Sequence, residues 1–210
     1  MISRVVAALA DSALLLPASV LLFVYLLALG QVRLAAAWAL ALGLAGSITL
    51  AAKLVFHACG QAVSDGDIVS PSGHASFAVI FYGALAIVVG SGRPAPVRPL
   101  LAAGTLLLVA AVGVSRVRTG AHTPAEVAIG IAIGAAALAV FALLHARAGR
   151  PGVPWRPVVA GFAAALLLLG GLHFSLEHRI GRIARQVSAA LDVCAGPERA
   201  DLSGPPSGRR

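Results

Sequence analysis

Hydrophobic residues in this chain fall into six long runs separated by short polar segments. The runs cover about residues 12–29, 34–53, 75–89, 99–114, 124–144 and 158–174. A helix needs about 20 apolar residues to cross the hydrocarbon core of a bilayer, where every backbone amide must bond within its own segment. The pattern therefore predicts an all-α protein, a six-span transmembrane helical bundle.

The polar segments between the runs contain the residues that end helices. The segment 91–96, Ser-Gly-Arg-Pro-Ala-Pro, is expected to form a turn, and the linker 146–157 holds three Pro and three Arg. A polar loop is expected at 57–71. We therefore expect one transmembrane domain, residues 1–177, with its motifs between residues 53 and 130. The basic tail, residues 178–210, is rich in Pro, Gly and Ser, and we expect it to be disordered.

The composition agrees with a membrane protein and gives no support to a nucleic-acid partner. Hydrophobic residues make up 59% of the chain and charged residues only 11%, with a mean hydropathy of +0.93. A soluble domain carries about 25% charged residues. The net charge of +8 comes from arginines at the ends of the runs, where they can meet anionic lipid headgroups. No basic stripe interleaved with aromatic residues is present, so membrane lipids are the expected partners and nucleic acid is not.

The distribution of arginine also predicts an orientation. The segments 31–33, 91–98 and 146–157 share one face of a six-span bundle. Together they hold six arginines: Arg33, Arg93, Arg98, Arg147, Arg150 and Arg156. The positive-inside rule places this face in the cytoplasm, although the basic residues after the sixth run favour the opposite orientation. We expect a bacterial inner-membrane protein whose other face, with the loops before the third and fifth runs, points outward.

Titratable residues gather in two of these outward loops, and such residues at membrane depth are costly and usually functional. The first cluster comprises Lys53 and the segment Pro71-Ser72-Gly73-His74, and the second comprises Ser115, Arg116, His122 and Glu126. Because two spans separate the loops, both lie on one side of the membrane. The two clusters can therefore meet.

The first cluster and Arg116 have the chemistry of a phosphate site. Lys53 is the only lysine beside fifteen arginines, which suggests that a compact point charge is needed at that helix end. The start of the third span offers backbone amides and the positive end of a helix dipole, and Gly73 lets an anion approach the backbone closely. Arg116 can bind phosphate oxygens in a bidentate manner.

The second cluster predicts an activated histidine. Thr123 reads as the N-cap of the fifth span, Pro124 as its first residue and Glu126 as its third. A carboxylate there can accept a proton from one nitrogen of His122, which fixes the tautomer and leaves the other nitrogen to attack. His74 could then protonate the leaving group. Two histidines beside Lys and Arg predict phosphoryl transfer without a metal.

Structural roles compete with these catalytic ones. Glu126 also fits a capping box with Thr123, and the two roles can coexist. Ser72 can serve as a helix cap, and Lys53 can be a snorkelling residue at a helix end. A metal site is a further alternative, but its candidate ligands follow no standard spacing, so no metal and no cofactor are expected. Those candidates are His57, Cys59, Asp65, Asp67 and His74.

The motifs resemble those of the type 2 phosphatidic acid phosphatase family. Its signature is a Lys with Arg-Pro, then Pro-Ser-Gly-His, then Ser-Arg-x5-His-x3-Asp. This sequence has Lys53 18 residues before Pro71, the complete second motif at 71–74, and Ser-Arg-x5-His-x3-Glu at 115–126. The resemblance covers residues 53–130. It implies a six-helix core with the motifs on one face.

The resemblance also implies a role for each matching residue. His122 would be the nucleophile that forms a phosphohistidine, Glu126 the carboxylate that orients it, and His74 the general acid. The phosphate would be bound by Lys53, Ser72, Gly73 and Arg116. No metal is implied.

Two positions depart from the family pattern. Gly60-Gln61 stands where Arg-Pro is expected, and Arg118 is our candidate for the missing phosphate-binding arginine. Glu126 replaces Asp, and its extra methylene predicts a shifted helix start if the hydrogen bond to His122 is kept.

The predicted function is hydrolysis of a phosphomonoester or diphosphate of a lipid. The resemblance implies phosphatidate, phosphatidylglycerol phosphate, a polyprenyl diphosphate or a lipid A phosphate as substrate. The main alternative is a non-catalytic relative that binds or transports phospholipids, which the two departures favour. A third hypothesis is a vanadate-dependent oxidase built on the same anion site.

Overall fold

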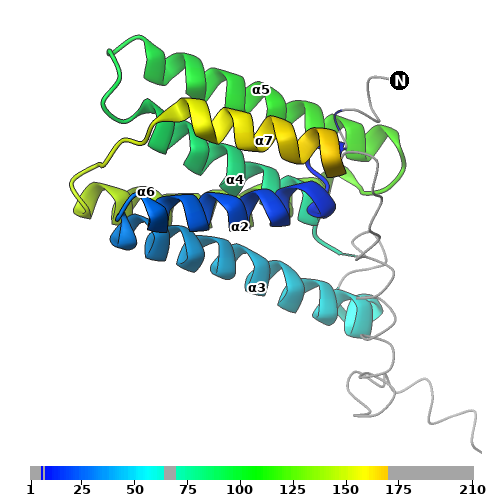
Figure 1. The fold of residues 1–210 in the computed structure, drawn as a ribbon. Helices are drawn as coiled ribbons and strands as arrows, with labels where there is room; N and C mark the ends of the chain where they lie inside the picture. Colours follow the sequence, from blue (N-terminus) through cyan, green and yellow to red (C-terminus); the bar gives the residue numbers. More distant parts are fainter. Residues whose placement is uncertain (1–5, 7, 64–69, 170–210) are drawn as a thin grey trace, which may run out of the picture.

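A computed structural model describes residues 6, 8–63 and 70–169, without the side chains of 57–63 and 169. Within these residues the chain forms six helices and no strands, which confirms the all-α prediction (Figure 1). The helices are α2 (Ser12–Ala28), α3 (Val32–Val63), α4 (Gly73–Gly90), α5 (Val97–Arg118), α6 (Pro124–Arg147) and α7 (Trp155–Leu169).

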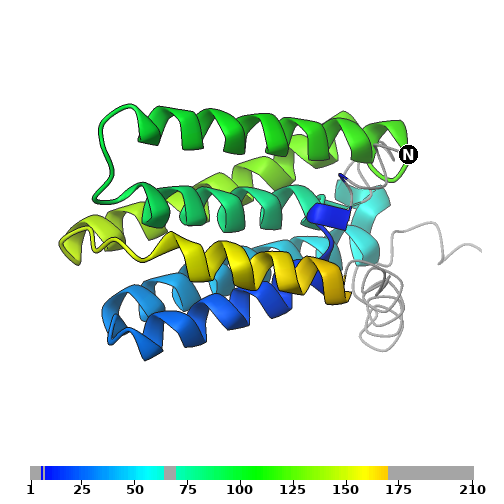
Figure 2. The same cartoon turned by 45° about the horizontal axis from the view of Figure 1, so that its top comes forward.

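The helices run along a common direction and alternate in polarity. Figures 1 and 2 show that α2, α4 and α6 begin at the end of the bundle where α3, α5 and α7 finish. The segment that leads into α4 and the turn that leads into α6 are therefore at the same end. The two polar clusters lie on one face, as predicted.

Four of the six predicted spans are confirmed by length and apolar character. The helical segments that could cross a membrane are Val32–Phe56, Gly73–Gly90, Val97–Arg118 and Pro124–Arg147. The first and last predicted runs form shorter apolar helices, Ser12–Ala28 and Trp155–Leu168. Residues 170–174 of the last run, and the predicted tail, lie outside the described residues.

The second predicted span is longer than expected. The polar loop predicted to begin at residue 57 is wrong, because α3 continues to Val63. No proline occurs between residues 54 and 70, and one glycine inside a helix costs only about 1 kcal/mol, so nothing in this stretch forces an earlier end. Lys53 consequently lies inside α3, ten residues before its last residue, and its predicted place at a helix end is also wrong.

An aromatic cluster around Trp38 joins four helices. The Trp38 ring of α3 packs edge-on against Phe81 of α4 and Phe141 of α6, with ring centroids 5.9 and 6.1 Å apart. Its indole N–H donates to the carbonyl of Ser19 in α2 at 3.1 Å. Trp38 is 1% exposed, so this aromatic cluster lies in the interior of the bundle. The polar residues lie at one end of the bundle.

Helices α4 and α6 approach each other closely at two glycines. A Cβ atom added at Gly130 would overlap the carbonyl oxygen of Ser72, and one added at Gly134 would lie 2.5 Å from the carbonyl oxygen of Ser76. The Gly-x-x-x-Gly pattern therefore packs helices within one chain. Its consequence is that the first turns of α4 and α6, which carry the predicted catalytic residues, are held side by side.

Candidate active site

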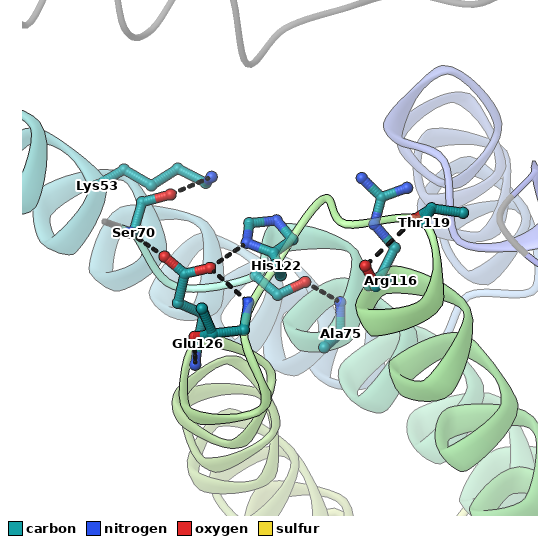
Figure 3. A network of polar contacts seen from close by, with 9 residues as sticks. Lys53, Ser70, Ala75, Arg116, Thr119, His122 and Glu126 are labelled. Carbon is teal, nitrogen blue, oxygen red and sulfur yellow. Dashed lines mark hydrogen bonds and ion pairs between the residues drawn. The ribbon is translucent and has the colours of Figure 1, made fainter. Parts of the chain in front are cut away.

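Four helices contribute to a polar cluster at one end of the bundle (Figure 3). Helix α3 supplies Lys53, and the residues 70–74 lead into and begin α4. The last turn of α5 supplies Arg116, and the turn before α6 supplies His122. In Figure 3, Lys53 and Arg116 lie on either side of His122. The structure thus brings together residues from both predicted clusters.

The start of α6 has the cap that the sequence predicts. Thr123 is the N-cap, and its hydroxyl accepts a hydrogen bond from the Glu126 amide at 3.3 Å. The Glu126 carboxylate in turn accepts from the Thr123 amide at 2.9 Å, which completes a capping box. Pro124 is the first helical residue, so this helix start is confirmed residue by residue.

The same carboxylate also contacts His122. Oε2 of Glu126 lies 3.0 Å from Nδ1 of His122, and Oε1 accepts a hydrogen bond from the Ser70 amide at 2.7 Å. The capping contact and the contact with His122 therefore coexist. The Glu126 side chain folds back over the first turn and reaches the imidazole from the third helical position, and the predicted shift of the helix start relative to the family pattern stays a prediction.

The contact with Glu126 assigns the tautomer of His122. An ionised carboxylate only accepts hydrogen bonds, so Nδ1 must carry the hydrogen and the lone pair must be on Nε2. Both side chains are buried, His122 with 7% and Glu126 with 4% of its surface exposed. Burial strengthens the hydrogen bond electrostatically and restricts the ring to one orientation.

Lys53 lies over the beginning of α4. It is buried, and its Nζ donates to the Ser70 hydroxyl at 3.4 Å. Its Cε would be 3.6 Å from a Cβ added at Gly73, so the lysine stem passes directly beside this glycine. A snorkelling lysine would extend away from the bundle; this ammonium group instead points to the start of α4.

The Pro-Ser-Gly-His segment forms the first turn of α4. Ser72 is the N-cap, and its hydroxyl accepts from the Ala75 amide at 3.4 Å. Its own amide donates to the Glu126 carbonyl at 3.0 Å, which ties α4 to α6. The capping role of Ser72 is thus present, and its contact with phosphate stays a prediction. His74 is the second residue of the helix and is half-buried.

The two arginines at the end of α5 differ in position. Arg116 is half-buried, and among the described residues its Nε is buried without a hydrogen-bond partner. Arg118 is exposed and follows two residues later, which is about 200° around a helix. None of the described contacts joins Arg118 to the cluster. Its role as a substitute for the missing arginine stays a prediction.

Sequence reasoning missed Ser70, which contacts both Lys53 and Glu126. Its place directly before Pro71 indicates an extended backbone, but the sequence does not show which group its amide contacts. The alternative metal site stays untested. The side chains of His57 and Cys59, and the residues Asp65 and Asp67, lie outside the described part of the chain.

Comparison with known proteins agrees with this arrangement. The family model described as the PAP2 superfamily matches residues 34–150, more than half of the chain. A protein of Klebsiella pneumoniae named "Uncharacterized 22.5 kDa protein in cps region" is 31% identical over 182 residues, which cover 84% of this chain and 87% of that protein. No solved structure gave a significant match. The family match includes every residue of the polar cluster.

Proposed function

Because this chain belongs to the PAP2 superfamily, which generally hydrolyses phosphate esters, we propose that it is an integral membrane phosphatase acting on a phosphomonoester or diphosphate of a lipid through a phosphohistidine intermediate. The observation that carries the proposal is the 3.0 Å contact between His122 Nδ1 and the buried Glu126 carboxylate. This contact directs the lone pair of Nε2 away from the carboxylate, as a nucleophile requires.

The first step transfers the phosphoryl group to the enzyme. Nε2 of His122 attacks phosphorus and forms a P–N bond while the bond between phosphorus and the leaving oxygen breaks. His74 donates a proton to that oxygen. Glu126 stabilises the positive charge that develops on the imidazole, as the carboxylate of a catalytic triad does.

The second step releases phosphate. His74, now neutral, accepts a proton from a water molecule that attacks phosphorus. The P–N bond breaks, and its electron pair returns to Nε2 of His122. Both histidines then regain their starting protonation states.

Cationic groups around the phosphoryl group supply the charge stabilisation that this chemistry needs. Lys53 and Arg116 reach the cluster from different helices, and the first amides of α4 add the positive end of its dipole. Ser72, Gly73 and Arg118 complete the proposed phosphate-binding set.

The site lies at the end of apolar helices, which favours a substrate with its phosphate at headgroup level and its apolar part in the bilayer. The candidate substrates are phosphatidate, phosphatidylglycerol phosphate, polyprenyl diphosphates and lipid A phosphates. The alternative of a non-catalytic lipid-binding relative retains one supporting observation, Gly60-Gln61 in place of Arg-Pro.

The test is phosphate release from a panel of these lipids by detergent-purified protein in the presence of EDTA. We expect release by the wild type and a loss of at least about 10⁴-fold in His122→Ala, comparable to removal of a catalytic triad member. The variant should match the wild type in gel filtration and Tm. No release by folded wild type from any lipid would contradict the phosphatase proposal and favour the binding protein.

A further inference from the structure

Ser70 is buried between the lysine of α3 and the carboxylate of α6. It is 4% exposed and is the last residue but one before the N-cap of α4. Its two polar groups contact different partners, and neither contact is local in sequence. The hydroxyl meets Lys53, 17 residues earlier, and the amide meets Glu126, 56 residues later.

The amide contact fixes the backbone of Ser70 relative to His122. At 2.7 Å, the hydrogen bond from Ser70 N to Oε1 is the shortest of the contacts described for the Glu126 carboxylate. Proline follows Ser70 and restricts its backbone to extended conformations. The Ser72 amide adds a second link to α6 at 3.0 Å. The position of the Ser70 hydroxyl is therefore tied to the catalytic histidine through Glu126.

The hydroxyl contact then places the ammonium group. A lysine side chain has four rotatable carbons and a charge with no preferred direction, so burial alone does not define where its Nζ lies. The Ser70 Oγ accepts a hydrogen bond from Lys53 Nζ at 3.4 Å, which holds the ammonium group beside the first turn of α4. A residue without an acceptor at this position would leave the backbone link to Glu126 in place and remove the link to Lys53.

We infer that Ser70 is a positioning residue that sets the Lys53 ammonium at a fixed place relative to His122. This inference rests on the proposed phosphatase function. It gives this serine a part in aligning a phosphate-binding charge with the nucleophile, although Ser70 belongs to none of the three motifs. In this role Ser70 acts through Lys53.

The experiment compares Ser70→Ala and Ser70→Thr with the wild type, using inorganic phosphate as the probe. Its inhibition constant is measured from lipid hydrolysis, and its dissociation constant by calorimetry. Ser70→Ala should weaken phosphate binding about threefold to tenfold, the effect of one ordinary hydrogen bond, because the 3.4 Å contact is long, and it should raise KM more than it lowers kcat. Ser70→Thr keeps the hydroxyl and should restore binding. Ser91→Ala removes a hydroxyl at the far end of α4 and should change neither constant.

A double-mutant cycle with Lys53→Met separates positioning from a general structural role. If Ser70 acts through Lys53, Ser70→Ala should have no further effect on phosphate binding in the Lys53→Met background. An equal loss in both backgrounds, or a lower Tm with an unchanged phosphate affinity, would overturn the inference while hydrolysis by the wild type upheld the proposed function. Wild type that neither hydrolyses lipid phosphates nor binds inorganic phosphate would overturn both.

Discussion

At the scale of single residues, the Glu126 carboxylate connects helix capping to histidine orientation. It accepts hydrogen bonds from the Thr123 amide, the Ser70 amide and His122 Nδ1. An aspartate at the same position would be shorter by one methylene, about 1.5 Å. It could not keep all three contacts without a backbone shift. In this chain the longer Glu126 side chain makes all three contacts from the third position of α6.

Glu126→Gln should lower kcat about 10²- to 10⁴-fold with a smaller change in KM. The amide nitrogen of Gln donates where Glu accepts, so the substituted side chain favours the wrong histidine tautomer, as in the equivalent triad variant. Glu126→Asp should lie between Gln and the wild type. Steady-state kinetics on the best lipid of the panel provides the measurement. A Gln variant with wild-type kcat would show that Glu126 serves only as a helix cap.

A second prediction at this scale concerns the two arginines of α5. Arg116→Ala should raise KM about tenfold or more, because a charge-assisted contact to phosphate contributes about 1.5–3 kcal/mol. If Arg118 replaces the missing family arginine, Arg118→Ala should raise KM as well. Unchanged kcat and KM in Arg118→Ala would reject that role and leave Arg116 as the arginine of the site.

Sequence reasoning at the residue scale succeeded where local spacing carries the chemistry. Thr123, Pro124 and Glu126 are close in sequence, so their cap could be predicted from spacing alone. Ser70 could not be predicted in this way, because its contact with Glu126 uses a backbone amide and spans 56 residues. Backbone groups have no signature in the sequence, and only the packing of α4 on α6 brings this pair together.

At the scale of elements, helix boundaries were predictable where the chain contains a stop or start signal. The start of α6 has a capping box and an N1 proline, and the prediction is confirmed. The end of α3 has no such signal. The helix end predicted from the apolar run, residue 53, lies ten residues before the observed end at Val63. Hydrophobicity predicts where a helix is within the membrane, but it does not predict how far the helix continues beyond it.

The close approach of α4 and α6 can be tested with a matched pair of glycine substitutions. Gly130→Ala should destabilise the protein by about 1–3 kcal/mol and reduce activity, because the new methyl group meets the Ser72 carbonyl and separates the two first turns. Gly104→Ala on α5 meets nothing within 4 Å and should be neutral or slightly stabilising. Thermal unfolding in detergent gives the comparison. Equal Tm values for the two variants would contradict the packing role of Gly130.

At the scale of the whole molecule, the two ends of the bundle differ in chemistry. One end holds the polar cluster of Lys53, His74, Arg116, His122 and Glu126, and the other holds the six arginines that predict a cytoplasmic face. The alternating direction of the helices follows from the sequence, because short polar segments join successive apolar runs. The sequence also predicted that the two clusters share one end, but the packing of α4 on α6 that joins them required the structure, because no sequence pattern gives the order in which helices pack.

The orientation can be tested by cysteine labelling in intact bacterial cells. Cys59 and Cys194 are first replaced by Ala, with retained activity as the control. Ala121→Cys, exposed in the turn before α6, should react with a membrane-impermeant maleimide in intact cells. Ala95→Cys, exposed in the turn between α4 and α5, should react only after permeabilisation. The reverse pattern would place the site in the cytoplasm.

The bond between Ser70 and Glu126 has a consequence for biogenesis. Membrane helices insert individually and associate afterwards. Until α4 docks on α6 and α3, Glu126 lacks the bond from the Ser70 amide and Lys53 lacks its bond to the Ser70 hydroxyl. A newly inserted chain would therefore carry every catalytic residue and yet be inactive toward the lipids around it. Activity would appear only after α4 has docked on α6, so it would report this helix association directly.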